Sequence, residues 1–328
     1  MPIAPNELGL IGESLARLRE QVGRAVVGQQ EVIEQTLVAF VASGHVLYEG
    51  LPGLGKTLLA RALAQALSLQ FSRVQFTPDL MPTDLTGHAI LEPSAEGGIG
   101  RLRLRKGPVF TNLLLGDEIN RAPAKTQSAL LEVMQERQVT LEGQTLALPR
   151  PFMVLATQNP IDSEGTYPLP EAQRDRFLFK IDIDFPTQED EVAVVKAATG
   201  HRIGDALPLE AVERCLDEAG VMRLQQCVAD VLIDDRVVDY AVRLTRATRG
   251  AVGLGQGAGS RGAIALVRAA RAAALVQGRD FATPDDVKRQ VLPALRHRVA
   301  LAPDAQLEGR RIDDVLRDVV ARVDAPRL

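Results

Sequence analysis

Tryptophan is absent from this sequence of 328 residues, and aromatic residues make up only 4% of it. A hydrophobic core must therefore be built mainly from Leu, Val, Ile and Ala, which favours helices packed on a parallel sheet over an aromatic-rich β-sandwich. The two cysteines, Cys215 and Cys227, are too few and too far apart for a metal site or a disulfide framework. Each is expected to be a small buried hydrophobic residue.

An excess of positive charge and long apolar runs are missing as well. The net charge is −4 and the sequence pI is about 5.7, so the chain lacks the basic footprint of a duplex nucleic-acid binder. The sequence shows no basic segment followed by an apolar one near its start, and no run of about 18 apolar residues. We therefore expect a cytoplasmic protein with neither a secretory signal nor a membrane span, and nucleic acid is an unlikely partner.

Short apolar runs alternate with helical patterns between residues 44 and 186, which predicts an α/β fold with a buried parallel sheet. After Pro186 the strand-like runs vanish, Ala becomes more frequent and helical periodicity dominates. The sequence thus predicts a helical segment at 1–25, an α/β domain at 26–187 and an all-helical domain at 188–328.

The strongest motif is GLPGLGKT at residues 50–57, between an apolar strand and a helical run. This is a P-loop, in which glycines let backbone N–H groups curl around phosphate oxygens at a helix N-terminus. Lys56 would reach the β- and γ-phosphates, and Thr57 would bind Mg²⁺. The alternative is a chance glycine-rich turn. The nucleotide-binding residues predicted here are Gly50, Pro52, Gly53, Leu54, Gly55, Lys56, Thr57 and Leu58.

Two further strands end in polar residues. Asp117 and Glu118 follow an apolar run, where Asp117 would be a second Mg²⁺ ligand and Glu118 the general base that polarises water. Acidic residues often end strands, so the assignment depends on the P-loop upstream. Asn159 ends a third strand and could orient the water or contact the γ-phosphate, although Asn-Pro is also a common turn. ATP and Mg²⁺ are therefore the expected cofactors.

Several long, ordered motifs resemble the MoxR family of AAA+ ATPases. They are GDEINRAP at 116–123, KTQSALLE at 125–132, ATQNP at 156–160, YPLPEAQ at 167–173 and DRF at 175–177, and the resemblance runs from about Val27 to about Val287. It implies a P-loop AAA+ core followed by a helical lid. It also implies that Val27 and Gly28 lie in the segment that binds the adenine base, although these residues could merely cap the helix that follows.

The resemblance assigns two arginines to catalysis. Arg176 matches the arginine finger, which reaches the γ-phosphate of a neighbouring subunit; a local salt bridge with Asp175 or Asp182 is the alternative. Arg174 stands where family members usually carry an aliphatic residue, so it competes with Arg176 for this role. Arg261 matches the sensor-2 position and would contact the γ-phosphate from the lid of its own subunit. Family members commonly have Pro near this Ser-Arg step, and this chain has none.

Two insertions mark the branch of AAA+ proteins that this chain resembles. The segment before Val109, MPTDLTGHAILEPSAEGGIGRLRLRKGP, resembles the helix-2 insertion, and residues 138–148 alternate around Glu142-Gly143 as a hairpin does. The positive residues at 101, 103, 105 and 106 are either a solvated strand face or a contact for an acidic partner. No aromatic residue occurs in the first insertion, so it lacks a stacking platform for single-stranded nucleic acid.

The resemblance implies a homo-oligomeric ring, most simply a hexamer, that acts as a chaperone-like remodeller of a partner with a von Willebrand factor A (VWA) domain. The alternatives are the ATPase subunit of a metal chelatase, a nucleic-acid motor, and a nucleotide-binding scaffold without turnover. The acidic pI argues against the motor, and the presence of both Glu118 and Arg176 argues against the scaffold.

Overall fold

A computed structural model describes residues 3–92, 101–159, 166–200 and 207–327 of the chain. Its centre is a five-stranded sheet in the order β2-β5-β8-β1-β9, and all neighbouring strands are parallel. The strands are β1 (Val46–Glu49), β2 (Phe71–Gln75), β5 (Leu113–Asp117), β8 (Met153–Gln158) and β9 (Phe179–Asp182). The three inner strands β5, β8 and β1 are almost entirely buried, which suits a sheet that is covered on both faces.

Alternate residues of each central strand enter two different cores. Val46 and Tyr48 of β1 pack in a core with α1 (Pro5–Ala25), α2 (Gln30–Val41) and α3 (Lys56–Ala66). Leu47, between them, packs on the other face with Phe76 and α5 (Ala124–Glu136). This alternation is the period of two expected for strand side chains, and it confirms the predicted α/β architecture.

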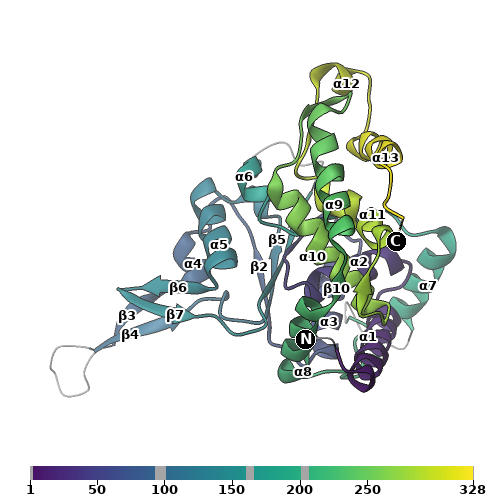
Figure 1. The fold of residues 1–328 in the computed structure, drawn as a ribbon. Helices are drawn as coiled ribbons and strands as arrows, with labels where there is room; N and C mark the ends of the chain where they lie inside the picture. Colours follow the sequence, from purple (N-terminus) through teal and green to yellow (C-terminus); the bar gives the residue numbers. More distant parts are fainter. Residues whose placement is uncertain (1–2, 93–100, 160–165, 201–206, 328) are drawn as a thin grey trace.

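Two antiparallel hairpins extend from the α5 side of the sheet (Figure 1). The first follows α4 (Pro82–Thr86) and pairs β3 (Gly87–Glu92) with β4 (Arg101–Lys106). The second pairs β6 (Gln138–Leu141) with β7 (Gln144–Ala147), as the alternation predicted. Glu142 and Gly143 at its turn both have positive φ angles, 47° and 76°, which matches a tight two-residue hairpin turn.

The chain after β9 is mainly helical, as predicted. Its longer helices are α7 (Gln188–Thr199), α8 (Glu218–Asp230), α9 (Asp235–Ala247), α10 (Ser260–Val276), α11 (Pro284–Leu295) and α13 (Ile312–Arg322). Short elements complete the fold: α6 (Glu171–Arg174), α12 (Pro303–Leu307), the 3₁₀ turns η1 (Ile119–Arg121) and η2 (Thr248–Gly250), and the paired strands β10 (Leu232–Ile233) with β12 (Phe281–Ala282) and β11 (Leu254–Gln256) with β13 (Ala300–Leu301). These strands are too short to leave a sequence pattern.

Side-chain caps fix where two of these helices begin. The Thr187 hydroxyl accepts a hydrogen bond from the backbone N–H of Asp190 at the start of α7. Thr283 and Asp286 form a reciprocal capping box at the start of α11. At both helix starts Thr is followed three residues later by an acidic residue, a pattern that is typical of a helix start.

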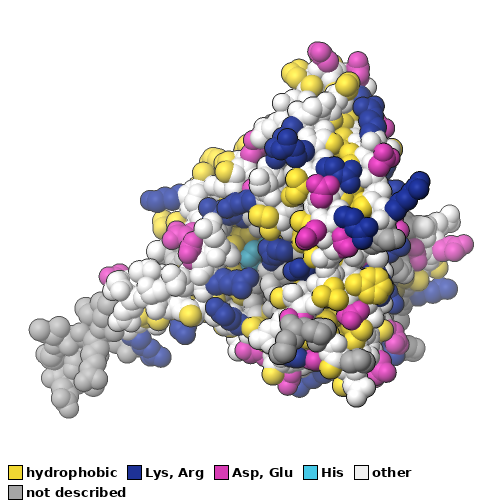
Figure 2. Space-filling view, in the orientation of Figure 1, with side chains coloured by type: hydrophobic (Ala, Val, Ile, Leu, Met, Phe, Trp, Pro, Cys, Tyr) yellow, Lys and Arg dark blue, Asp and Glu magenta, His cyan; other side chains and the backbone are white. Residues whose placement is uncertain are grey.

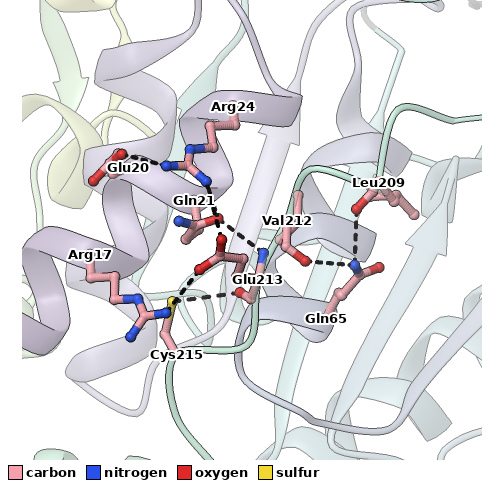
Figure 3. Close-up of polar contacts among 9 residues, drawn as sticks. All are labelled: Arg17, Glu20, Gln21, Arg24, Gln65, Leu209, Val212, Glu213 and Cys215. Atoms are coloured by element: carbon pink, nitrogen blue, oxygen red, sulfur yellow. Dashed lines mark hydrogen bonds and ion pairs between the residues drawn. The ribbon is translucent and has the colours of Figure 1, made fainter.

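The segment at 207–216 joins α7 to α8 by crossing α1 and α3 (Figure 3). Gln65 of α3 donates hydrogen bonds to the carbonyl oxygens of Leu209 and Val212, at 2.9 and 2.8 Å. Gln21 of α1 accepts one from the backbone N–H of Glu213. Helix α1 also contacts α3 and α10, so the segment predicted at 1–25 shares its core with both larger parts of the chain.

Among the described residues, no helix combines the length and apolar character that a membrane crossing requires.

Candidate functional site

The loop at residues 50–57 connects β1 to α3 and has the shape that phosphate binding requires. Gly53 and Gly55 have φ angles of 86° and 78°, and a Cβ added at either position would meet no atom within 4 Å. Glycine at these two positions therefore serves the positive φ, which other residues rarely adopt, rather than a lack of space. A Cβ at Gly50 would lie 2.5 Å from the carbonyl oxygen of Ile183, which explains glycine at that position. No side chain caps the first turn of α3, so its N–H groups can bind an anion.

Lys56 lies across this loop. Its Nζ donates hydrogen bonds to the carbonyl oxygens of Gly50 and Leu51, at 2.5 and 2.9 Å. Partial burial lowers the pKa of Lys56, while the negative charges of Asp117 and Glu118 oppose that shift. The ammonium group therefore lies near two carboxylates in a partly desolvated position, where an additional anion would stabilise its charge.

Asp117 and Glu118 stand at the carboxyl end of β5, as predicted. Asp117 is 6% exposed, and its Oδ2 accepts a hydrogen bond of 2.6 Å from Nε of Arg73 on β2. Glu118 has a positive φ of 56°, and its Oε2 lies 3.0 Å from Nε2 of Gln75 and 2.8 Å from Nε of Arg121. Carboxylate and hydroxyl oxygens are the ligands that Mg²⁺ prefers, so Asp117 and Thr57 fit this ion.

Thr157 connects the ends of β5 and β8. Its hydroxyl accepts a hydrogen bond from the backbone N–H of Glu118 at 2.9 Å and lies 3.4 Å from Oδ1 of Asp117. Because β8 pairs with both β5 and β1, Asn159, which directly follows β8, lies at the same edge of the sheet. We call this edge, with the loop at 50–57, Asp117, Glu118 and Asn159, the carboxyl edge.

Gly28 lies beside the chain that follows β9, the strand at one side of the sheet. It has a φ of 77°, and a Cβ there would lie 2.6 Å from Cβ of Asp190 and 3.0 Å from Cβ of Pro186. The side chain of Gln29 donates a hydrogen bond to the carbonyl oxygen of Asp184. Val27 and Gly28 therefore lie against the connection between β9 and α7. The adenine role predicted for them stays a prediction.

Arg176 and Arg261 lie at the opposite edge of the sheet, which we call the amino edge. Arg176 precedes β9, and its Nη1 donates a hydrogen bond of 2.6 Å to the carbonyl oxygen of Leu131 on α5. Arg261, in the first turn of α10, lies 3.6 Å from Oδ2 of Asp175. The two arginines line one cavity, and Arg174 does not contribute to its lining.

This position disagrees with the prediction that Arg261 contacts the nucleotide of its own subunit. In the pairing of β1 with β9, Val46 and Phe179 mark the amino end and Glu49 and Asp182 the carboxyl end. Asp175 lies before the amino end, whereas Lys56 follows the carboxyl end. The lid docks α10 beside α2 and α1, and this packing directs Arg261 away from the loop at 50–57 of its own chain.

Sequence reasoning missed the partners of the two carboxylates, Arg73, Gln75 and Arg121. Arg73 and Gln75 alternate on β2 and so share one face of the sheet. They meet Asp117 and Glu118 only because β2 pairs with β5, with Gln75 opposite Asp117. No local pattern states which strands are neighbours, although polar side chains at alternate positions of a strand are a usable signal.

Comparisons with known proteins agree with this architecture. Residues 45–179 match the ATPase family associated with various cellular activities (AAA), and residues 246–319 match an AAA lid domain. The fold and the carboxyl edge therefore define the class as an AAA+ ATPase.

Similar proteins narrow the class to a family. The chain is 43% identical to Chaperone MoxR1 of Mycobacterium tuberculosis, over 98% of this chain and 85% of that protein. It is 32% identical to Protein MoxR of Methylorubrum extorquens, over 96% of each. A crystal structure of a protein assigned as an ATPase from Cytophaga hutchinsonii is 37% identical and covers 98% of this chain and 97% of its own, with a TM-score of 0.88. This chain belongs to the MoxR family of AAA+ ATPases, and its enzymatic activity is ATP hydrolysis.

Proposed function

We propose that this ATPase hydrolyses ATP between the subunits of a closed ring, most simply a hexamer, and uses the resulting motion to remodel or activate a partner protein. The observation that carries the proposal is the separation of the two edges. Arg176 and Arg261 lie together at the amino edge, and the loop at 50–57 lies at the carboxyl edge. A head-to-tail ring would bring the amino edge of one subunit to the carboxyl edge of the next.

Each residue of the carboxyl edge then has one role. Gly53, Gly55 and the N-terminus of α3 cradle the phosphates, and Lys56 moves from the loop carbonyls to the β- and γ-phosphates. Thr57 and Asp117 hold Mg²⁺, which would neutralise phosphate charge when bound.

The remaining groups act on the water and on the transition state. Glu118 accepts the proton of the attacking water, while Asn159 orients that water. Arg176 and Arg261 of the neighbouring subunit stabilise the charge that develops on the γ-phosphate.

The output is assigned by resemblance to one relative named as a chaperone. In this proposal the partner carries a VWA domain whose folding or metal-dependent activation the ATPase assists. Capture of interacting proteins on a Glu118→Gln variant loaded with ATP tests this assignment. Enrichment of a VWA-domain protein relative to a Lys56→Ala control supports it, and equal recovery on both variants contradicts it.

Mixing inactive subunits tests the shared site directly. Glu118→Gln should bind ATP and lose turnover by about a hundredfold or more, since a positioned general base contributes at least that factor. Arg176→Ala should also be inactive. A 1:1 mixture should recover about a quarter of the wild-type rate, because random mixing joins an intact carboxyl edge to an intact amino edge at about one interface in four.

The control for this experiment is a mixture of Arg176→Ala with Arg261→Ala. Both changes damage the amino edge, so no interface is complete and no activity should return. If the Glu118→Gln and Arg176→Ala subunits co-assemble in sedimentation measurements and still show no recovery, the shared site is wrong.

A further inference from the structure

The amino edge contains a cavity of about 390 Å³ whose lining is unusually rich in arginine. Figure 2 shows Lys and Arg side chains gathered around this hollow, between α5 and α10 in the middle of the view. The volume lies within the range of about 300–1,000 Å³ that is typical of ligand pockets. We call it the arginine cavity; its charged lining residues are Arg137, Asp175, Arg176, Arg261, Arg268 and Arg298.

The charges of this lining do not balance. Five guanidinium groups face one carboxylate, Asp175, so the formal charge of the described lining is +5 − 1 = +4. Nε of Arg298 donates a hydrogen bond of 2.7 Å to Oδ1 of Asp175, and Nη1 of Arg261 lies 3.6 Å from Oδ2 of the same carboxylate. Three arginines of the cavity therefore lack a carboxylate partner among the described residues.

Arg176 is one of the three, and the other two are Arg137 and Arg268, for which the sequence suggested no role. Arg268, on α10, donates hydrogen bonds to the carbonyl oxygens of Ala42 and Ser43, at 2.6 and 3.3 Å. Arg137, at the end of α5, reaches the carbonyl oxygen of Ser43 at 3.4 Å. Both arginines thus converge on one loop between α2 and β1.

Backbone carbonyls satisfy hydrogen-bond donors but supply little negative charge. The C-terminus of a helix carries about half a negative charge, and α2 and α5 both end here, so the surplus remains near three positive charges. Burial lowers the pKa of Arg137 and of Arg268; the charge of Arg137 lowers that of Arg268 further, and the charge of Arg150, outside the cavity, lowers that of Arg137. Holding like charges together in a partly desolvated cavity is unfavourable unless an anion enters it.

We infer that the arginine cavity receives the triphosphate of the nucleotide bound by the neighbouring subunit, and that Arg137 and Arg268 contact it together with Arg176 and Arg261. The inference rests on the proposed shared site, which brings this edge to the adjacent carboxyl edge. A nucleoside triphosphate has the compact, multiple negative charge that four convergent guanidinium groups would bind. His45 also lines the cavity and is buried; its Nδ1 accepts a hydrogen bond from the backbone N–H of Val154, and its Nε2 bonds with the carbonyl oxygen of Met134.

The experiment uses Arg137→Gln and Arg268→Gln in the full chain. Glutamine keeps an N–H donor for the carbonyl oxygens of Ala42 and Ser43 while it removes the positive charge. Each variant should lose about a hundredfold or more in kcat, since one preorganised donor to transition-state charge contributes on this order. ATP binding by isolated subunits should be unchanged, because their own carboxyl edge is intact. Arg289→Gln, an exposed position on α11, is the matched control and should keep the wild-type rate.

Subunit mixing separates this role from a structural one. Arg268→Gln or Arg137→Gln mixed with Glu118→Gln should recover activity, because the variant subunit supplies an intact carboxyl edge and its neighbour an intact amino edge. The same variants mixed with Arg176→Ala should recover none. Wild-type kcat in both variants, or no recovery with Glu118→Gln although Arg176→Ala does recover, overturns the inference while leaving the shared site standing. Failure of Arg176→Ala to recover would instead reject the proposed function itself.

Lysine variants keep the test decisive if a glutamine variant does not fold. Arg137→Lys and Arg268→Lys retain the positive charge but lose the planar fork, so each should keep more of the wild-type kcat than the matching glutamine variant does. An equal loss in folded lysine and glutamine variants would show that the carbonyl contacts alone matter and would overturn the inference.

Discussion

The carboxyl edge and the amino edge of the sheet differ in charge, in chain composition and in how their side chains are held. The carboxyl edge combines the phosphate loop with the acidic residues Asp117 and Glu118. The amino edge collects arginines from α5, α10 and the segment before β9 around a single aspartate. Four residues of β1 separate the two edges, about 13 Å at the usual rise of a strand.

In the proposed shared site, this difference means that neither edge is complete without the other. Among the described residues beside Asp117 and Glu118, the positive side chains of Lys56, Arg73 and Arg121 already contact loop carbonyls or the two carboxylates. The amino edge has surplus positive charge and no phosphate loop. The complementary charges also favour a defined head-to-tail contact between copies of the chain.

The places of the phosphate loop, Asp117, Glu118 and Asn159 at the carboxyl edge could be predicted from the sequence. The P-loop, Asp117 and Asn159 each end or follow a strand with a clear apolar pattern, and parallel strands bring such ends together. The Glu142-Gly143 turn and the Thr187 and Thr283 caps were local signals too. Each depends on a few consecutive residues, and the structure agrees with them.

The amino edge could not be predicted in this way. Its arginines come from distant segments, and their meeting depends on how the lid docks on α1 and α2, which no local periodicity encodes. Arg261 shows the consequence, because the resemblance placed it beside the nucleotide of its own subunit, whereas the lid docks it at the amino edge. The pairing of Arg73 with Asp117 was missed for the same reason, since strand order is a long-range property.

The largest effect on stability should come from Arg298, which anchors the amino edge. Its side chain is 4% exposed and donates to Asp175, to the carbonyl oxygens of Phe177 and Leu178, and to that of Ala294. Arg298→Met should lower the free energy of unfolding by about 3 kcal/mol, because these acceptors lose a buried charged partner. Chemical denaturation measures the change. Arg261→Met is the control at the same aspartate; its exposed side chain should contribute less than about 1 kcal/mol. An equal loss in the free energy of unfolding for both variants would contradict a special anchoring role of Arg298.

Acid should weaken the amino edge through His45. Burial lowers the pKa of His45 to about 4, below its ordinary value of 6.5, so the unfolded chain takes up the proton first. The free energy of unfolding should therefore fall by about 1.4 kcal/mol per pH unit as the pH drops from 6.5 to 4, about 3 kcal/mol in all. His297, whose pKa burial also lowers, acts in the same direction.

Denaturation curves at pH 7 and pH 4.5 measure this dependence, and His45→Gln is the matched variant. Glutamine can accept from the N–H of Val154 and donate to the carbonyl oxygen of Met134 without titrating. The variant should lose less stability on acidification than the wild type. An identical pH dependence in both proteins would exclude His45 as the source.

The smallest effect is expected at the carboxyl edge, where Arg73 neutralises Asp117. The 2.6 Å contact competes with a metal ion for the same carboxylate, but Arg73 is 53% exposed and its contribution is screened. Arg73→Gln should lower the Mg²⁺ concentration for half-maximal ATPase activity by about two- to fivefold, the range that a screened ion pair supplies. Arg61→Gln, on the exposed face of α3, removes the same charge without touching Asp117 and should leave the Mg²⁺ requirement unchanged. A higher Mg²⁺ requirement in Arg73→Gln would mean that Arg73 positions Asp117 for the metal rather than competing with it, and the carboxyl edge would then be as preorganised by arginine as the amino edge is.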